Sequence, residues 1–232
     1  MSERKILSRR ETEAYILKDL IKVNGEIVRD LGRQVDPAKD KVEIVDSPSK
    51  NNHRNRTHDR KITIAFNKPR GIVSSKSRSE GKTIFDLVPQ FADLNAVGRL
   101  DKESEGLILL SNDGVVTSAV TGDDHKVEKE YEVSTREPLK ERHIRIMARG
   151  MKIDNEEHTL PAKVELLSDH AFKIILKEGK RHQIRRMCSA LNLTITNLRR
   201  TRIGNIFLLG ISAGRYKTLS DKETERLKLL AK

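Results

Sequence analysis

The chain has few aromatic residues and a single cysteine. Of its 232 residues, five are Phe, three are Tyr and none is Trp, and the lone cysteine is Cys188. One cysteine cannot form an internal disulfide, and it excludes zinc sites that are built on paired cysteines. No apolar run approaches the roughly 18 residues that a membrane-spanning helix needs, so we expect no membrane segment.

Motifs that bind nucleotides or metal ions are also missing. The chain contains no G-x-x-x-x-G-K-[ST] loop, no G-x-G-x-x-G after an apolar strand and no H-E-x-x-H pair. Its seven histidines do not have the spacing of metal ligands. We therefore expect chemistry that uses neither a metal ion nor a cofactor.

Basic residues are what the chain has in excess. It contains 46 Lys and Arg against 34 Asp and Glu, which gives a formal net charge of +12. Such a surplus is typical of proteins that bind polyanions, and nucleic acid is the first candidate. The first residues, MSERKILSRRETE, contain no apolar stretch of the kind that a secretion signal needs. We expect a cytoplasmic monomer whose partner is a nucleic acid.

A polar segment divides the chain into two parts of unequal length. Residues 46–61 read DSPSKNNHRNRTHDRK, and Pro48 is the only non-polar residue among them. A segment of this composition cannot join a hydrophobic core, so we interpret it as a basic polar linker. It separates a small unit, residues 1–45, from a large unit, residues 62–232. The small unit would be marginal as an independent fold.

The small unit is expected to contain a helix followed by a hairpin. The helix is predicted over residues 8–22, and IKVNGEIV at 21–28 fits two short strands. Asn24-Gly25 suits a type I′ turn between them, because both residues tolerate positive φ. Arg9 and Arg10 lie on or beside the helix, where they form either a solvated charged face or a contact for RNA.

Apolar patterns in the large unit predict more strands than helices. Helices are expected over residues 138–149, 179–192 and 221–232. Because strands predominate without strict alternation of strand and helix, we expect an α+β fold with a largely antiparallel mixed sheet and flanking helices. The predicted strands are ITIAF, GLILLS, KEYEVST, AKVELLS, AFKIILK and LTITNLRR.

The segment VGRLDKESEGLILLSNDG, residues 97–114, places Asp101 in a turn beside an apolar strand. An Asp in such a turn often bonds nearby backbone amides and does nothing more. Its position at the rim of a sheet, however, is one where a cleft can open. Arg99, two positions earlier on a strand, is expected to point to the same face as Asp101.

A second polar segment is predicted to be helical. In KEGKRHQIRRMCSALN, residues 177–192, Arg181 and Arg185 fall along one edge of an apolar stripe, whereas His182 and Arg186 face the opposite way. Arg185 is therefore expected to be half-buried and Arg186 solvated. A half-buried guanidinium needs a carboxylate, which is either a structural partner or a catalytic one.

A third segment, EKEYEVST at residues 128–135, reads as a strand on which Tyr131 shares a face with Lys129. A strand Tyr usually packs into a core. In a basic chain with so few aromatic residues, Tyr131 is also a candidate for stacking on a nucleic-acid base.

Together these segments resemble the pseudouridine synthases of the RsuA, RluB, RluE and RluF group. NKPRGIVSS at 67–75 is similar to the first motif of that group, GRLDKESEGLILLSNDG to its catalytic motif and EGKRHQIRRM to its third. LRRTRIGNIFLLGISAGRYKTLSDKE resembles its closing segment, so the likeness covers residues 62–232. The helix and VNG turn are similar to a shortened S4 RNA-binding module. Within the group the chain looks nearest to RluF-type enzymes, which act on 23S ribosomal RNA.

The resemblance implies a reaction and roles for particular residues. A uridine in ribosomal RNA would flip out and become pseudouridine without a cofactor, after attack of a carboxylate on the ribose. Asp101 would be the catalytic Asp, Arg185 its partner, Tyr131 the residue that packs against the base, and Arg99 the residue that replaces the flipped nucleotide. The remaining candidate RNA contacts are Lys129, Arg181, Arg9 and Arg10.

Other functions remain open at this stage. The same reaction could take place on 16S ribosomal RNA or on transfer RNA. A ribosome-assembly factor that binds RNA through its basic surface alone would give Asp101 no role beyond its turn. An RNA methyltransferase is disfavoured, because no Gly-rich nucleotide loop follows a strand.

Overall fold

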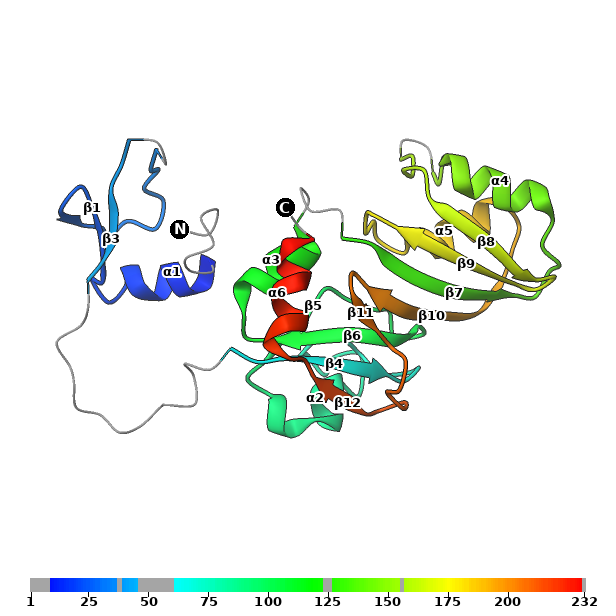
Figure 1. The fold of residues 1–232 in the computed structure, drawn as a ribbon, viewed down its shortest axis with the longest axis horizontal. Coiled ribbons are helices and arrows are strands. Elements are labelled where there is room, and N and C mark those ends of the chain that lie inside the picture. Colours follow the sequence, from blue (N-terminus) through cyan, green and yellow to red (C-terminus); the bar gives the residue numbers. More distant parts are fainter. Residues whose placement is uncertain (1–8, 37–38, 46–60, 123–126, 155–156, 231–232) are drawn as a thin grey trace. The chain divides into compact units, whose positions relative to one another are not determined.

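The computed structural model describes residues 9–36, 39–45, 61–122, 127–154 and 157–230. The chain forms two compact units, one of residues 1–61 with 113–115 and one of residues 62–112 with 116–232. Figure 1 shows both units, and each is considered by itself. Apart from Lys61, the expected linker lies outside the described residues. Within the described ranges, no helix is long and apolar enough to cross a membrane.

The smaller unit consists of one helix and a three-stranded antiparallel sheet with the order β2-β1-β3. Among its described residues, the core contains four buried apolar side chains, with Tyr15, Val35 and Val42 packed against them. The four buried residues are Ile16, Ile21, Val23 and Val28. The elements are α1 (Arg9–Ile16), β1 (Ile21–Val23), β2 (Glu26–Ile27) and β3 (Val42–Ile44).

Helix α1 ends six residues earlier than the sequence pattern predicts. Asp19 adopts a left-handed conformation with φ 57°. The N–H of Leu20 donates to the Tyr15 carbonyl at 2.9 Å, and that of Asp19 donates to the Ile16 carbonyl at 3.0 Å. These bonds close the helix as a Schellman turn, so the chain is free to enter β1.

The predicted hairpin is confirmed. Lys22 pairs with Ile27 and Val23 with Glu26. Asn24 and Gly25 connect the two strands with φ of 53° and 87°, as a type I′ turn requires.

The larger unit is built on a nine-stranded sheet with the order β12-β4-β6-β10-β7-β9-β8, in which β11 also pairs with β10 and β5 with β6. Only β6 and β10 run parallel among the described pairs, so the predicted α+β fold with a largely antiparallel mixed sheet is confirmed. The strands are β4 (Thr63–Lys68), β5 (Asn95–Val97), β6 (Glu105–Ser111), β7 (Lys129–Thr135), β8 (Lys163–Ser168), β9 (Ala171–Leu176), β10 (Ile195–Ile203), β11 (Ile206–Phe207) and β12 (Tyr216–Thr218).

Helices cover both faces of this sheet. The helices are α2 (Ile84–Leu87), α3 (Gly114–Thr121), α4 (Glu141–Arg149), α5 (Gln183–Ala190) and α6 (Asp221–Leu229), with a 3-10 turn at Pro89–Phe91. Strand residues alternate between the two faces. Leu107 and Leu109 therefore pack with α3 and α6, which lie side by side in Figure 1, whereas Ile108 and Leu110 pack with Ile84 of α2.

The helical pattern of the sequence predicts α4, α5 and α6 but not α2 or α3. The box that caps α6 is present, with Ser220 accepting from the Glu223 N–H and Glu223 accepting from the Ser220 N–H. Helix α2 contains only four residues, and α3 has no charged side chain to mark a polar face, so the sequence pattern identifies neither. Met147 of α4, together with Met187 and Cys188 of α5, fills a third core cluster beneath β7 and β9.

Candidate active site

A cleft of about 1490 Å³ opens in the larger unit. Its walls come from the three polar segments that the sequence singles out and from residues 73–75. Six of the predicted site residues line it: Asp101, Arg99, Lys129, Tyr131, Arg181 and Arg185. Among the residues that the structure describes, no group of His, Cys, Asp and Glu could hold a metal ion.

Asp101 lies in an irregular turn between β5 and β6. Gly98, with φ 75°, turns the chain out of β5, and the N–H of Ser104 donates to the Asp101 carbonyl at 3.0 Å. The prediction that Arg99 and Asp101 share the face of a strand is therefore wrong. Both line the same cleft, but because the chain bends at Gly98 and not because of strand alternation.

The Asp101 turn is held in place by the segment that follows β4. The N–H of Gly71 donates to the Lys102 carbonyl at 2.7 Å. The Ser74 hydroxyl donates to the Leu100 carbonyl at 2.7 Å and accepts from the Leu100 N–H at 3.1 Å. These bonds explain why a site at residue 101 needs a second motif near residue 70.

Lys68 supports the same turn from within the core. Its side chain is fully buried, and its ammonium donates to the carbonyls of Ile72 at 2.7 Å, Pro69 at 3.0 Å and Lys102 at 3.4 Å. Burial lowers the pKa of Lys68 to about 8, against the opposing effect of the nearby Asp101 carboxylate. At neutral pH the ammonium is therefore mostly charged. Sequence reasoning missed this residue, although a Lys at the end of an apolar strand is a signal for it.

Arg185 on α5 contacts both the carboxylate and the turn. Its Nε donates to Oδ2 of Asp101 at 3.2 Å, and its Nη2 donates to the Ser104 hydroxyl at 3.0 Å. Ser104 is buried, whereas the side chain of Asp101 remains 36% exposed. The carboxylate is thus held from one side and open to the cleft on the other.

His182 is a second partner of Asp101 that the sequence pattern did not reveal. Its Nε2 lies 3.5 Å from Oδ1 of Asp101. Helix α5 begins at Gln183, and His182 is its N-cap in a left-handed conformation with φ 51°. The helical projection therefore does not apply to His182 or Arg181, and the prediction that His182 faces away from Arg185 is wrong.

The prediction that Arg186 is solvated is wrong, because its guanidinium is paired with carboxylates. It forms ion pairs with Asp154 and Glu157, and Lys180 donates to Glu157 at 3.0 Å. The bonds from Arg186 and Lys180 lower the pKa of Glu157. These charges hold the segment of residues 177–192 against residues 154 and 157, so they fix the chain on both sides of His182.

Tyr131 on β7 faces the cleft beside a buried cation. The guanidinium carbon of Arg200 lies 6.0 Å from the Tyr131 ring centroid. Arg200 is 4% exposed and donates through Nε to the Leu107 carbonyl at 2.7 Å. A Cβ at Gly106 would stand 2.3 Å from the Arg200 carbonyl, so only glycine lets β10 bring Arg200 this close to β6.

The other predicted contacts differ in how accessible they are. Arg99 and Arg181 are exposed in the cleft wall. Lys129 is mostly enclosed, since its ammonium donates to the Val127 carbonyl at 3.1 Å and burial lowers its pKa to about 8. The side chains of Arg9 and Arg10 lie outside the described part of the structure.

One further segment of the sequence matches a catalytic motif of hydrolases but does not have the structure of that motif. GISAG at residues 210–214 fits the pattern G-x-S-x-G, which in hydrolases forms a sharp turn from a strand into a helix. Here it lies in the loop between β11 and β12. The structural context of a nucleophilic serine is therefore missing at Ser212.

Comparison with known proteins agrees with this arrangement. The family model described as RNA pseudouridylate synthase matches residues 61–190. The chain is 37% identical over 228 residues to the dual-specificity RNA pseudouridine synthase RluF of Escherichia coli K12, covering 96% of this chain and 74% of that protein. It is 31% identical to ribosomal small subunit pseudouridine synthase A of Haemophilus influenzae, covering 95% of this chain and 94% of that protein.

A solved structure has the same fold over nearly the whole length. It is described as a crystal structure of pseudouridylate synthase, and it matches with a TM-score of 0.71 and 29% identity, covering 97% of this chain and 96% of the other. The family match includes the Asp101 turn and the Arg185 helix. The chain therefore belongs to the RsuA, RluB, RluE and RluF family of RNA pseudouridine synthases and is an isomerase that acts on RNA.

Proposed function

We propose that this enzyme converts a specific uridine of ribosomal RNA to pseudouridine, and that 23S ribosomal RNA is its substrate. The names of several relatives refer to the ribosomal subunits. The 37% identity to RluF exceeds the 31% to the small-subunit enzyme and the 28% to a large-subunit enzyme of Bacillus subtilis. We therefore propose the 23S substrate from the likeness of the motifs to RluF-type enzymes. RluF is named as a dual-specificity enzyme, so 16S ribosomal RNA and transfer RNA are the alternatives to test.

The observation on which this proposal depends is the half-exposed carboxylate of Asp101 between the Arg185 guanidinium and the His182 imidazole. Arg185 and His182 lie 3.2 and 3.5 Å from its two oxygens. A nearby guanidinium favours the ionised form of a carboxylate. These two contacts present the Asp101 carboxylate to the cleft in a fixed orientation, which an attack on ribose requires.

The proposed reaction breaks the N1–C1′ bond of the uridine, turns the uracil and forms a C5–C1′ bond. N1 gains a proton and C5 loses one, so nothing is oxidised or hydrolysed and no cofactor is consumed. Asp101 either attacks C1′ as a nucleophile or removes a proton from C2′. Both routes need the ionised carboxylate that Arg185 and His182 hold.

The cleft walls suggest how the uridine is presented. Flipping a base out of its stack costs a few kcal/mol. We propose that Arg99, exposed and without an ion-pair partner among the described residues, fills the gap. Tyr131 then packs against the flipped base, and Arg181 and Lys129 lie near its phosphates.

We also propose that residues 1–45 form an S4-like RNA-binding module, that 46–61 are a linker and that 62–232 are the catalytic domain. The α1 helix, the small sheet and the VNG turn support this assignment. The small core of this unit suits a module whose role is to bind RNA and not to support chemistry.

Mapping of pseudouridines tests the substrate. Carbodiimide adducts stop reverse transcriptase at pseudouridine, so RNA from cells with and without the protein should differ by a stop in 23S ribosomal RNA. Purified protein should restore that stop on a transcript of the same region. A stop that appears only in 16S ribosomal RNA or transfer RNA would show that this RNA, and not 23S ribosomal RNA, is the substrate. No stop anywhere would favour a non-catalytic RNA-binding role.

A further inference from the structure

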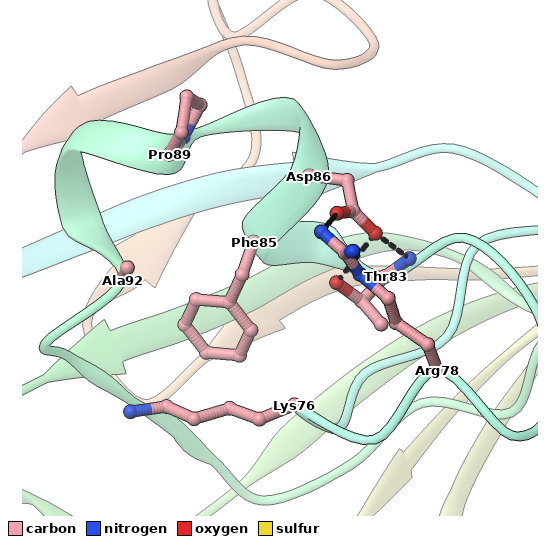
Figure 2. Close-up of a pocket in the computed structure, with 7 residues that line it drawn as sticks. All are labelled: Lys76, Arg78, Thr83, Phe85, Asp86, Pro89 and Ala92. Atoms are coloured by element: carbon pink, nitrogen blue, oxygen red, sulfur yellow. Dashed lines mark hydrogen bonds and ion pairs between the residues drawn. The ribbon is translucent and has the colours of Figure 1, made fainter.

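A second cavity of about 550 Å³ lies beside the short helix α2. Figure 2 shows Phe85 of α2 next to Lys76, with Arg78, Thr83 and Asp86 grouped at the other end. No residue of this cavity belongs to the catalytic motifs described above.

The Phe85 side of the cavity combines an aromatic ring with a free cation. Phe85 is half-buried and packs against the core cluster around Ile84. The Lys76 ammonium lies 5.2 Å from the centroid of its ring. Lys76 is exposed and has no ion-pair partner within the described part of the chain. An aromatic face and a mobile cation are the two groups that bind an unpaired nucleotide.

The other side of the cavity is a rigid wall. Asp86 forms an ion pair with Arg78 and accepts hydrogen bonds from the Thr83 N–H at 2.8 Å and the Thr83 hydroxyl at 2.9 Å. These bonds, those from Thr83 first, lower the pKa of Asp86. The Asp86 carboxylate therefore bonds to donors of the wall itself. Because Lys76 and Arg78 stand against this one carboxylate, the cavity has a net positive charge.

The same chain segment borders both this cavity and the Asp101 cleft. Ser75 and Glu80 line the cleft, whereas Lys76 and Arg78 line the cavity. Thr83 forms a β-bridge with Val73, next to the Ser74 hydroxyl that bonds to Leu100. The cavity is therefore joined to the Asp101 turn by a short series of backbone and hydroxyl bonds. An RNA strand that follows residues 75–80 out of the cleft would therefore reach the cavity.

We propose that this cavity binds one unpaired nucleotide that neighbours the target uridine, with its base stacked on Phe85 and its phosphate on Lys76. The inference rests on the proposed function only in taking RNA as the ligand. Stacking of a base on an aromatic ring is stronger than an exposed contact between an ammonium and the ring. Lys76 can thus leave the ring for the phosphate when the base arrives.

The test uses the full chain and a nine-nucleotide RNA with one central uridine and four adenosines on each side. Phe85→Leu keeps apolar bulk but removes the stacking face, and K76Q removes the cation from an exposed position where folding is unaffected. Each should raise the Kd for this RNA about fivefold. The matched controls are Phe91→Leu, which alters a ring packed on the same core cluster but outside the cavity, and K82Q, which alters an exposed lysine of the same segment.

A set of RNAs in which each flanking adenosine in turn is abasic locates the subsite. One abasic position should weaken binding to the unaltered protein about fivefold but have no further effect on the Phe85→Leu variant. Independent effects of the two changes, equal Kd values for variants and controls, or failure of the unaltered protein to bind this RNA would overturn the subsite. Conversion of ribosomal RNA is measured separately. If it fails while the coupling to Phe85 persists, the subsite stands and the proposed function does not.

Discussion

The Asp101 cleft and the Phe85 cavity are both bordered by one segment, residues 75–80, but hold their charges differently. Beneath the Asp101 turn, Lys68 is buried and bonded to three carbonyls, and in the cleft wall Arg185 is bonded to a carboxylate and a hydroxyl. In the cavity, Lys76 is exposed, and within the described part of the chain its ammonium contacts only the Phe85 ring. Chemistry on a ribose needs groups that are fixed before the substrate arrives, whereas binding of flexible RNA can use groups that adapt.

The largest expected effect is that of Asp101→Asn, which keeps the size of the side chain but removes its charge. Because both proposed routes require a carboxylate, kcat should fall by at least about 10³-fold, while RNA affinity is retained. Single-turnover assays on a transcript that the unaltered protein converts measure the rate of the reaction and the affinity for RNA. Asp93→Asn, at an exposed position outside the cleft, is the control. Turnover by the purified Asn variant, beyond the trace expected from deamidation, would show that Asp101 is only a turn residue.

A smaller loss is expected from Arg185→Met, which keeps much of the bulk but leaves Asp101 without its guanidinium. We expect kcat to fall about 10²-fold, since the carboxylate loses both orientation and charge compensation. Arg185→Lys should recover only part of this loss, because an ammonium cannot bond Asp101 and Ser104 together as the guanidinium does. Full recovery of activity by Arg185→Lys would mean that the bridging geometry has no role.

The buried cation Lys68 should be visible in the pH dependence of stability. Folded Lys68 loses its proton near pH 8, whereas the unfolded side chain does so near 10.5. Between these values the unfolded chain binds the extra proton, so the free energy of unfolding rises with pH. Lys129, whose pKa is also about 8, adds to this rise.

Lys68→Met should therefore lower the slope of the unfolding free energy against pH by up to about 1.4 kcal/mol per pH unit in that window. Denaturant titrations from pH 7.5 to 10.5 measure it, and exposed Lys82→Met is the control. An unchanged slope would show that Lys68 is not the buried ammonium that the structure places there.

The smallest effect is expected from the exposed cation. If Lys76 contacts a phosphate, K76Q should reduce the slope of log K against log salt by about 0.7, the value of one contact on a single strand. Lys129→Gln should change this slope less, since the Lys129 ammonium is enclosed and bonded to a carbonyl. Equal slopes of log K against log salt for the two variants would show that the exposed Lys76 contributes no more to phosphate binding than the enclosed Lys129.

The sequence by itself was enough for features that depend on neighbours along the chain. The Asn24-Gly25 turn, the capped helix α6 and the main strands of the larger sheet follow from local pattern and turn chemistry. The resemblance to a known family also indicated that Asp101 and Arg185 belong together, and the structure places them in contact. Their catalytic roles remain predictions.

The tertiary structure decided which groups surround the carboxylate. His182 reaches Asp101 because its left-handed conformation delays the start of α5, and Lys68 bonds to Lys102 of the same turn from 34 positions earlier in the chain. Arg186 finds its acids across a distance of about 30 residues. A periodicity reports which face of one element is apolar, but it contains no information about which distant element packs against that face. Contacts between remote segments are set by the packing of the whole sheet, so they could be read only from the fold.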